Sequence, residues 1–169
     1  MGGAGEQICN TLWLKGIEAK CLAHFGTNPW QSEWLNINDK FLVRKGMLGV
    51  ESTDYEVMDE VFEAHLSTFE KVIEPNVFYL VVCGLGGRTG AGLAINLSKL
   101  LVLHGKEFSV LATTPCRFEG KQRMCNALRA LEKLKSLAGN QQVFIQLEEL
   151  MTSDFWFFMP HQTIPIKMG

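Results

Sequence analysis

A glycine-rich turn is the strongest chemical feature of the sequence. It reads Gly-Leu-Gly-Gly-Arg-Thr-Gly over residues 84–90 and follows the apolar run Val77–Cys83. Glycines between a buried strand and a helix let the backbone approach a ligand closely, and the N–H groups at the helix N-terminus attract an anion. The turn holds more glycines than a simple reversal of the chain needs. We therefore predict that it binds a polyphosphate.

Two common phosphate-binding patterns do not fit this turn. The P-loop pattern requires a Lys-Ser/Thr pair after the glycines, and none follows Gly90. The dinucleotide pattern requires a third glycine where Thr89 stands, and an acidic residue about 20 positions further on. The turn must therefore belong to another class of phosphate site.

Three segments resemble the tubulin/FtsZ family. Residues 86–92 resemble the family signature GGGTG[SA]G, and Gly2–Asn10 resembles its first phosphate loop. Thr113–Arg123 resembles the FtsZ segment that carries Pro, Phe-Glu-Gly and Arg at these spacings. The three segments stand in the family's order, and the resemblance covers most of residues 2–147. The sequence is similar to a shortened form of the family's N-terminal GTP-binding domain.

The resemblance implies a site for GTP or GDP, with Mg²⁺ accompanying the triphosphate. It implies that the first loop lines the α and β phosphates, the second wraps the β and γ phosphates, and two later residues contact the ribose and base. From the residues alone, Glu119 and Arg123 would be an exposed i,i+4 ion pair. The implied nucleotide-binding residues are Gly3, Ala4, Gly5, Gln7, Gly86, Gly87, Arg88, Thr89, Gly90, Ala91, Glu119 and Arg123.

The sequence departs from the family pattern near the phosphates. Arg88 replaces a glycine of the signature. It either adds a cation for the phosphates or requires a backbone angle that arginine disfavours. Glu51 and Asp54 stand where the family places its γ-phosphate loop. Their charges would repel the γ-phosphate unless Mg²⁺ lies between them.

The ends of the sequence shape the functional expectation. We expect residues 1–150 to form the GTP-binding domain and 151–169 an aromatic-rich tail, with no second domain. The family's first strand and its activating acidic loop have no counterpart in these residues. We therefore expect a dimer or a partner-bound state, the partner being another copy or a complete FtsZ/tubulin-like subunit.

Two functions remain open, and we assign no catalytic residue. In the first, the chain is a cytoskeletal GTPase domain that hydrolyses GTP only in trans, against a complete partner subunit. In the second, it is a non-catalytic module that binds nucleotide or a filament subunit and caps or regulates the polymer. A third and weaker reading is a scaffold that has lost its ligand.

Strands alternate with helices along the chain. Buried strands are predicted at Val77–Cys83, Phe108–Ala112 and Val143–Leu147, and shorter ones at Ile17–Ala23 and Phe41–Arg44, with a loop at His24–Asp39. This alternation predicts an open, doubly wound, mostly parallel α/β sheet with helices on both faces and ligands at the carboxyl ends of the strands. The predicted helices are Gly5–Lys15, one long helix from Val57 to Ile73, Ala91–His104 and Phe118–Leu137.

Composition sets limits on the remaining functions. The chain has 169 residues, 47% of them hydrophobic, and a net charge of −2, so no basic field favours nucleic-acid binding. No apolar run approaches the about 20 residues of a membrane-spanning helix. Five cysteines, an odd number without a CxxC pair, predict free thiols in the reducing cytoplasm. The histidines, His24 among them, lack partners at catalytic spacing and are predicted to be core or surface residues.

Overall fold

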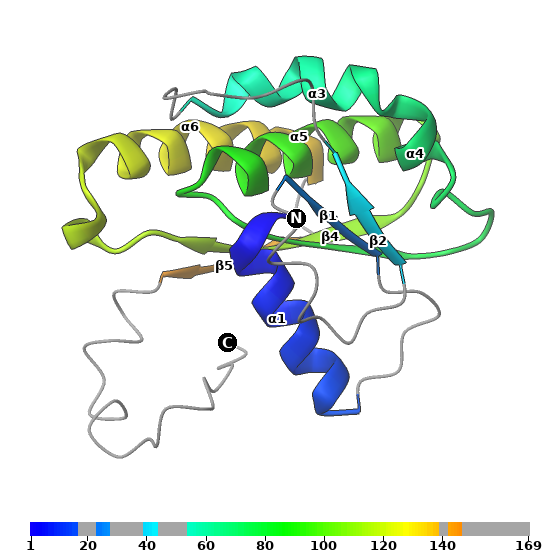
Figure 1. The fold of residues 1–169 in the computed structure, drawn as a ribbon, viewed down its shortest axis with the longest axis horizontal. Helices are drawn as coiled ribbons and strands as arrows, with labels where there is room; N and C mark the ends of the chain where they lie inside the picture. The colour runs from blue at the N-terminus through cyan, green and yellow to red at the C-terminus, as the bar shows by residue number, and fades with distance from the viewer. Residues whose placement is uncertain (17–22, 28–38, 44–53, 139–141, 147–169) are drawn as a thin grey trace.

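A computed structural model describes residues 1–16, 23–27, 39–43, 54–138 and 142–146 of the chain. Within these ranges the strands lie between two sets of helices (Figure 1). All observed strand pairs are parallel, in a two-stranded sheet β1–β2 and a three-stranded sheet β3–β4–β5. The strands are β1 (Ala23–Gly26), β2 (Asp39–Leu42), β3 (Tyr79–Gly84), β4 (Phe108–Thr114) and β5 (Gln142–Gln146).

Helices cover both sides of the strands. Helices α3, α5 and α6 lie on one side and α1 lies on the other (Figure 1). This arrangement confirms the predicted parallel α/β class with helices on both faces. The helices are α1 (Gly2–Leu14), α3 (Met58–Ala64), α4 (Leu66–Glu70), α5 (Arg88–Leu103) and α6 (Lys121–Ala138), with single 3-10 turns at Tyr55–Val57 and Arg117–Glu119.

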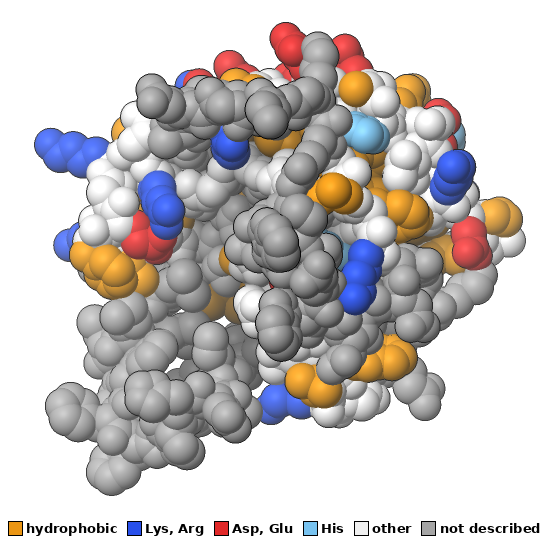
Figure 2. Space-filling view, viewed as in Figure 1, with side chains coloured by type: hydrophobic (Ala, Val, Ile, Leu, Met, Phe, Trp, Pro, Cys, Tyr) orange, Lys and Arg blue, Asp and Glu red, His pale blue; other side chains and the backbone are white. Residues whose placement is uncertain are grey.

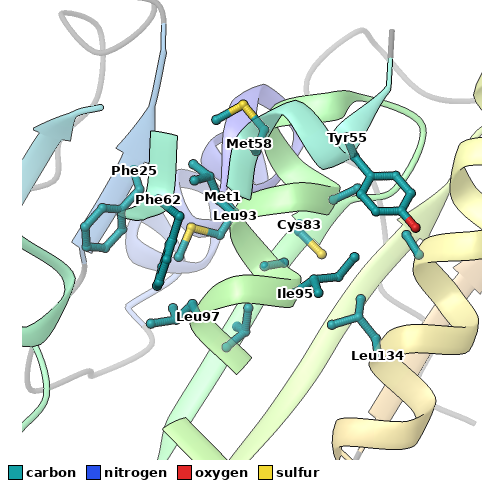
Figure 3. Close-up of a cluster of buried hydrophobic side chains, with 14 of the residues drawn as sticks. Met1, Phe25, Tyr55, Met58, Phe62, Cys83, Leu93, Ile95, Leu97 and Leu134 are labelled. Carbon is teal, nitrogen blue, oxygen red and sulfur yellow. The ribbon is translucent and has the colours of Figure 1, made fainter. Parts of the chain in front are cut away.

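The core is built around α5. Leu93 and Leu101 are fully buried, and Ile95 is 2% exposed. Figure 3 shows Phe25 and Phe62 on one side of this helix, and Tyr55 and Leu134 on the other. Because apolar groups from β1, α3 and α6 all contact α5, its axis and its N-terminus have a fixed place over the sheet.

The carboxyl ends of the strands meet at one edge. Gly84 at the end of β3 is in register with Thr113 near the end of β4. Thr114 is in turn in register with Gln146 at the end of β5. The loops that follow these strands therefore emerge side by side, as a ligand site of a parallel sheet requires.

Three local predictions were wrong. Residues His24–Gly26 form β1, although they were predicted to be a loop; most of the strand predicted at Ile17–Ala23 lies outside the described residues. The long helix predicted from Val57 to Ile73 is two helices, because the backbone of His65 leaves the helical region at φ −117° and ψ 16°. The apolar run before Gly84 is buried on both faces only near its end, since Leu80 is 51% exposed.

Helix α6 buries alanines as well as a leucine. Leu128 is 57% exposed, whereas Ala130 and Leu134 are fully buried. The small residues allow α6 to pack closely on α5 and β4. The buried residues of α6 are Asn126, Ala127, Ala130 and Leu134.

The surface shows no strong segregation of charge on the face in view. Lys, Arg, Asp and Glu side chains are scattered over it in Figure 2. None of the helices in the described ranges combines the length and apolar character needed to cross a membrane.

Candidate functional site

The N-terminus of α5 is the centre of the candidate site. Leu85 follows β3 and its N–H donates to the carbonyl of Thr113 at 2.9 Å, which ties the turn to β4. Gly87 precedes α5 with φ −99° and ψ 146° and has no side chain to cap the helix. The first N–H groups of a helix have no partner within it. This helix start therefore offers backbone donors to an anion.

Four glycines of the two predicted phosphate loops are required by packing. A Cβ on Gly2 would lie 2.8 Å from the backbone nitrogen of Gly90, and one on Gly90 would lie 2.6 Å from the carbonyl oxygen of Gly84. A Cβ on Gly84 would in turn lie 2.6 Å from that of Ala4, and one on Gly5 would collide with the carbonyl oxygen of Val82. The two loops are thus packed backbone against backbone.

Gly87 differs from these glycines. Among the described residues, no heavy atom lies within 4 Å of the place where its Cβ would be. Its backbone angles are ordinary extended ones that other residues adopt. Neither the described packing nor the conformation requires a glycine here. The open space leaves room for a ligand to approach the backbone at the start of α5.

Arg88 is the first residue of α5 and is half-buried. Among the described residues, Asn76 is the non-glycine residue with a positive φ, so Arg88 does not adopt the strained angle that was one of its two predicted consequences. The other consequence, an added positive charge beside the phosphates, stays a prediction.

The first predicted phosphate loop is the first turn of a helix. Helix α1 begins at Gly2, whereas the sequence predicted a start at Gly5. Gly3, Ala4 and Gly5 are therefore helical. Ala4 is exposed and Gly3 half-buried, while Gln7, one turn further along, is exposed.

Thr27 is a site residue that the sequence analysis missed. Its hydroxyl oxygen lies 3.3 Å from that of Thr89, in the first turn of α5. Thr27 directly follows β1, which was predicted to end before His24. A correct strand boundary would have placed this threonine at the carboxyl edge together with the other loops.

Glu119 and Arg123 contact each other. Glu119 Oε1 accepts a hydrogen bond from the backbone N–H of Cys116 at 2.8 Å, and its Oε2 accepts one from Arg123 Nη1 at 2.7 Å. The arginine is 57% exposed and the glutamate 24%. This is the i,i+4 ion pair that the spacing alone predicts; contact with a ribose or base stays a prediction.

Asp54 contacts a backbone N–H group and an arginine side chain. Its Oδ1 accepts the N–H of Glu56 at 3.2 Å, and its Oδ2 lies 3.4 Å from Arg129 Nη2. The cation of Arg129 offsets the negative charge that was predicted to repel the γ-phosphate. Glu51 and residues 151–169 lie outside the described residues. Within the described ranges no three His, Cys, Asp or Glu side chains form a metal-binding group, so a role for Mg²⁺ also stays a prediction.

These features define a parallel α/β domain with a glycine-rich helix start, without a side-chain cap, at the carboxyl edge of its strands. The sequence matches the Tubulin/FtsZ family, GTPase domain, over residues 1–152, and the chain belongs to this family. The family predicted from the three motifs is thereby confirmed.

Relatives of known name agree with this assignment. The chain is 35% identical over 140 residues to the cell division protein FtsZ of Methanothermobacter thermautotrophicus, which covers 81% of this chain and 36% of that protein. It is 30% identical over 138 residues to FtsZ of Aquifex aeolicus, covering 80% of this chain and 37% of that protein. The chain thus spans about a third of the length of these relatives.

Solved structures show the same fold. The empty FtsZ dimer of M. jannaschii is similar with a TM-score of 0.80 and 27% identity, over 95% of this chain and 46% of that one. CetZ1 from Haloferax volcanii, solved as a GDP-bound monomer, has a TM-score of 0.78 and 21% identity, over 90% of this chain and 51% of that one. At that identity the second likeness shows the fold alone.

Proposed function

We propose that this chain binds GTP or GDP at the carboxyl edge of its strands, with the β and γ phosphates at the start of α5. The observation that carries the proposal is Gly87, a glycine that neither its backbone angles nor the described residues around it require, at a helix start without a side-chain cap. Backbone donors at a helix N-terminus stabilise a phosphate through hydrogen bonds and through the helix dipole. Membership of a GTPase-domain family makes guanine nucleotide the ligand to test first.

The remaining site residues have roles in this proposal. Gly3, Ala4 and Gly5 present the first turn of α1 to the α and β phosphates, with Gln7 beside them. Gly86 to Ala91 surround the β and γ phosphates, and Arg88 adds positive charge. Glu119 accepts a hydrogen bond from a ribose hydroxyl, and Arg123 lies along the ribose or base; both side-chain types suit these contacts.

We further propose that hydrolysis requires a complete FtsZ/tubulin-like subunit in trans, in the cytoplasm. The proposal assigns no catalytic residue to this chain, so the chain alone is expected to bind nucleotide without turning it over. The alternative is a module that binds nucleotide or a filament subunit and takes no part in the chemistry.

Binding is tested by titrating the purified chain with a fluorescent GDP analogue and by calorimetry with GDP. The Gly87→Ala variant places a methyl group in the open space without a clash. It should lose at least about tenfold in affinity, equivalent to about 1.4 kcal/mol, with an unchanged melting temperature. His104→Gln, at an exposed position after α5, is the control. An unchanged affinity of Gly87→Ala would place the nucleotide elsewhere, and no binding by the wild type would leave only the scaffold reading.

Turnover is tested separately. GTP hydrolysis is measured for the chain alone at low concentration and then with added full-length FtsZ. Stimulation in the mixture supports hydrolysis in trans, and inhibition of the FtsZ polymer supports the binding-module alternative. Multiple turnovers by the chain alone would contradict both.

A further inference from the structure

A buried polar pair joins α1 to β1. Glu6 Oε2 lies 3.2 Å from His24 Nε2, and the two side chains are 3% and 4% exposed. Burying ionisable groups is costly unless they contact each other, and removing one partner leaves the other without compensation. A pair this deeply buried therefore determines how the two elements sit together.

The backbone of β1 is shaped around this histidine. A Cβ on Gly26 would lie 2.6 Å from Cε1 of the His24 ring, so the imidazole occupies the space that a side chain at position 26 would fill. Side chains two residues apart in a strand lie on the same face. Gly26 thus leaves room for the ring, and the strand fixes the direction in which Nε2 meets Glu6.

The pair also lies within a connected set of contacts around the candidate phosphate site. Glu6 follows Gly5, which packs against the backbone of β3. On the other side, His24 lies on the strand that leads into Thr27, whose hydroxyl is 3.3 Å from that of Thr89. The first turn of α1, the end of β1 and the start of α5 are thereby linked.

Few side chains within α1 are buried in the described structure. The buried residues of this helix are Gly2, Gly5 and Glu6. Trp13 is 42% exposed and Leu14 67% exposed. Met1, directly before the helix, is buried, and its amino group donates to the carbonyl oxygen of Val82 in β3 at 2.7 Å. Met1 thus anchors the helix start to β3, and Glu6 is the buried side chain within α1 that contacts β1.

We propose that Glu6 and His24 form a positioning pair that holds the first turn of α1 against the end of β1, so that the backbone of Gly3–Gly5 stays in place for the nucleotide phosphates. The inference rests on the proposed nucleotide site. It adds two residues that do not themselves contact the ligand.

The surroundings of the pair favour a neutral imidazole. Burial, together with the Met1 amino group and Lys40, lowers the pKa of His24 to about 4. Burial also raises the pKa of Glu6, against the opposing effect of the same two cations. Near neutral pH, His24 is therefore uncharged.

A double-mutant cycle tests the pair. Glu6→Ala and His24→Ala should each weaken the affinity for a fluorescent GDP analogue about tenfold. The double variant should bind about as tightly as each single variant, because the effects of two residues in one contact are not additive. Glu6→Gln keeps the size of the side chain and a polar group facing the imidazole, and should stay within about threefold of wild type. His104→Gln, an exposed histidine, is the matched control.

Two readouts separate positioning from a general loss of stability. Amide hydrogen exchange without nucleotide should become faster at residues 2–6 in Glu6→Ala while α5 stays protected. In the wild type, the imidazole ¹⁵N signals of His24 should move when GDP is added, a measurement that needs no variant. Unchanged affinity in both alanine variants, or a His24 signal insensitive to bound GDP, would overturn the proposal.

Failure of the proposed function is distinguishable from these outcomes. If the wild type binds no GDP, the proposed nucleotide site is wrong. Amide hydrogen exchange at residues 2–6 then still decides whether the pair holds α1. Unchanged exchange at residues 2–6 in Glu6→Ala would then overturn the positioning role by itself.

Discussion

Helix α1 begins at Gly2 and helix α5 directly follows Gly87, at the same edge of the strands, yet the two helices are held in different ways. Helix α5 buries residues along most of its length, Leu93 and Leu101 among them. Helix α1 buries two glycines and one glutamate, and its last turn is exposed. The start of α5 is fixed by apolar packing, whereas the start of α1 is fixed by close backbone contact, by buried Met1 and by the contact between Glu6 and His24.

This difference has a consequence for dynamics. Segments with few buried apolar contacts open at a lower free energy than the core does. We therefore expect the first turn of α1 to open more readily than the first turn of α5. If the nucleotide binds as proposed, with its phosphates at both helix starts, binding should stabilise α1 more than α5.

The same substitution in the two helices should produce the largest contrast. Leu93→Ala removes a fully buried side chain from α5 and should cost about 2–5 kcal/mol of unfolding free energy. Leu14→Ala, where the side chain is 67% exposed, should change it by about 0.5 kcal/mol or less. Urea unfolding measures both variants. Equal losses would show that α1 is packed as tightly as α5.

Glycine substitutions should separate packing from ligand contact. Gly5→Ala drives a methyl group into the carbonyl of Val82, and overpacking of this kind costs about 1–3 kcal/mol. Gly87→Ala meets no atom within 4 Å and should leave thermal stability unchanged. Thermal unfolding followed by circular dichroism checks the pair. A destabilised Gly87→Ala would mean that the turn before α5 is more crowded than the structure shows.

The α5 half of the fold could be predicted from the sequence because several signals agree there. A continuous apolar run, a glycine turn and a periodic helix follow one another from Val77 to His104, so local and tertiary preferences coincide. The prediction failed in the β1 region. Strand β1 contains the polar residue His24 and a glycine, Gly26, and both residue types weaken the strand pattern of the sequence. The strand forms nevertheless, because it pairs with β2.

The sequence located the glycine loop of the candidate site, but it did not reveal the side-chain contacts between residues that are distant in sequence. Glycines at 84–90 have a local signature, so the loop could be found by spacing alone. Thr27 and the Glu6–His24 pair join residues distant in sequence, and such contacts depend on the fold. The break at His65 likewise has no proline or glycine to mark it, since neither residue stands in 57–73.

The pH dependence of the unfolding free energy tests how the contact between Glu6 and His24 holds α1 against β1. The pKa of His24 falls from its ordinary 6.5 to about 4 in the fold, so its contribution to stability is present above pH 6.5 and is lost as the pH falls towards 4. The raised pKa of Glu6 acts in the opposite direction: its contribution is present below its ordinary 4.5 and is lost as the pH rises through the raised value.

Variants separate the two contributions. Relative to wild type, His24→Gln should gain stability as the pH falls from 6.5 towards 4, with a slope of at most about 1.4 kcal/mol per pH unit. Glu6→Gln should instead lose stability relative to wild type over the acidic part of this range. Urea unfolding of the three proteins at pH 7 and pH 5 provides the measurement. Parallel curves for all three would mean that the pair does not titrate with folding.

The smallest effect on stability is expected at Glu119 and Arg123. Their contact is a part-exposed i,i+4 pair, and breaking it with Arg123→Gln should cost about 0.3–0.5 kcal/mol. Lys133→Gln breaks a second exposed pair, with Glu56 at 3.2 Å, and should cost a similarly small amount. The two variants are therefore matched in stability. They should differ in nucleotide affinity, because only Arg123 is assigned to the ribose or base: Arg123→Gln should weaken GDP binding several-fold, and Lys133→Gln should leave it unchanged. Calorimetry with GDP measures the affinity of both variants. Equal affinities would mean that Arg123 and Glu119 form only the surface ion pair that their spacing predicts.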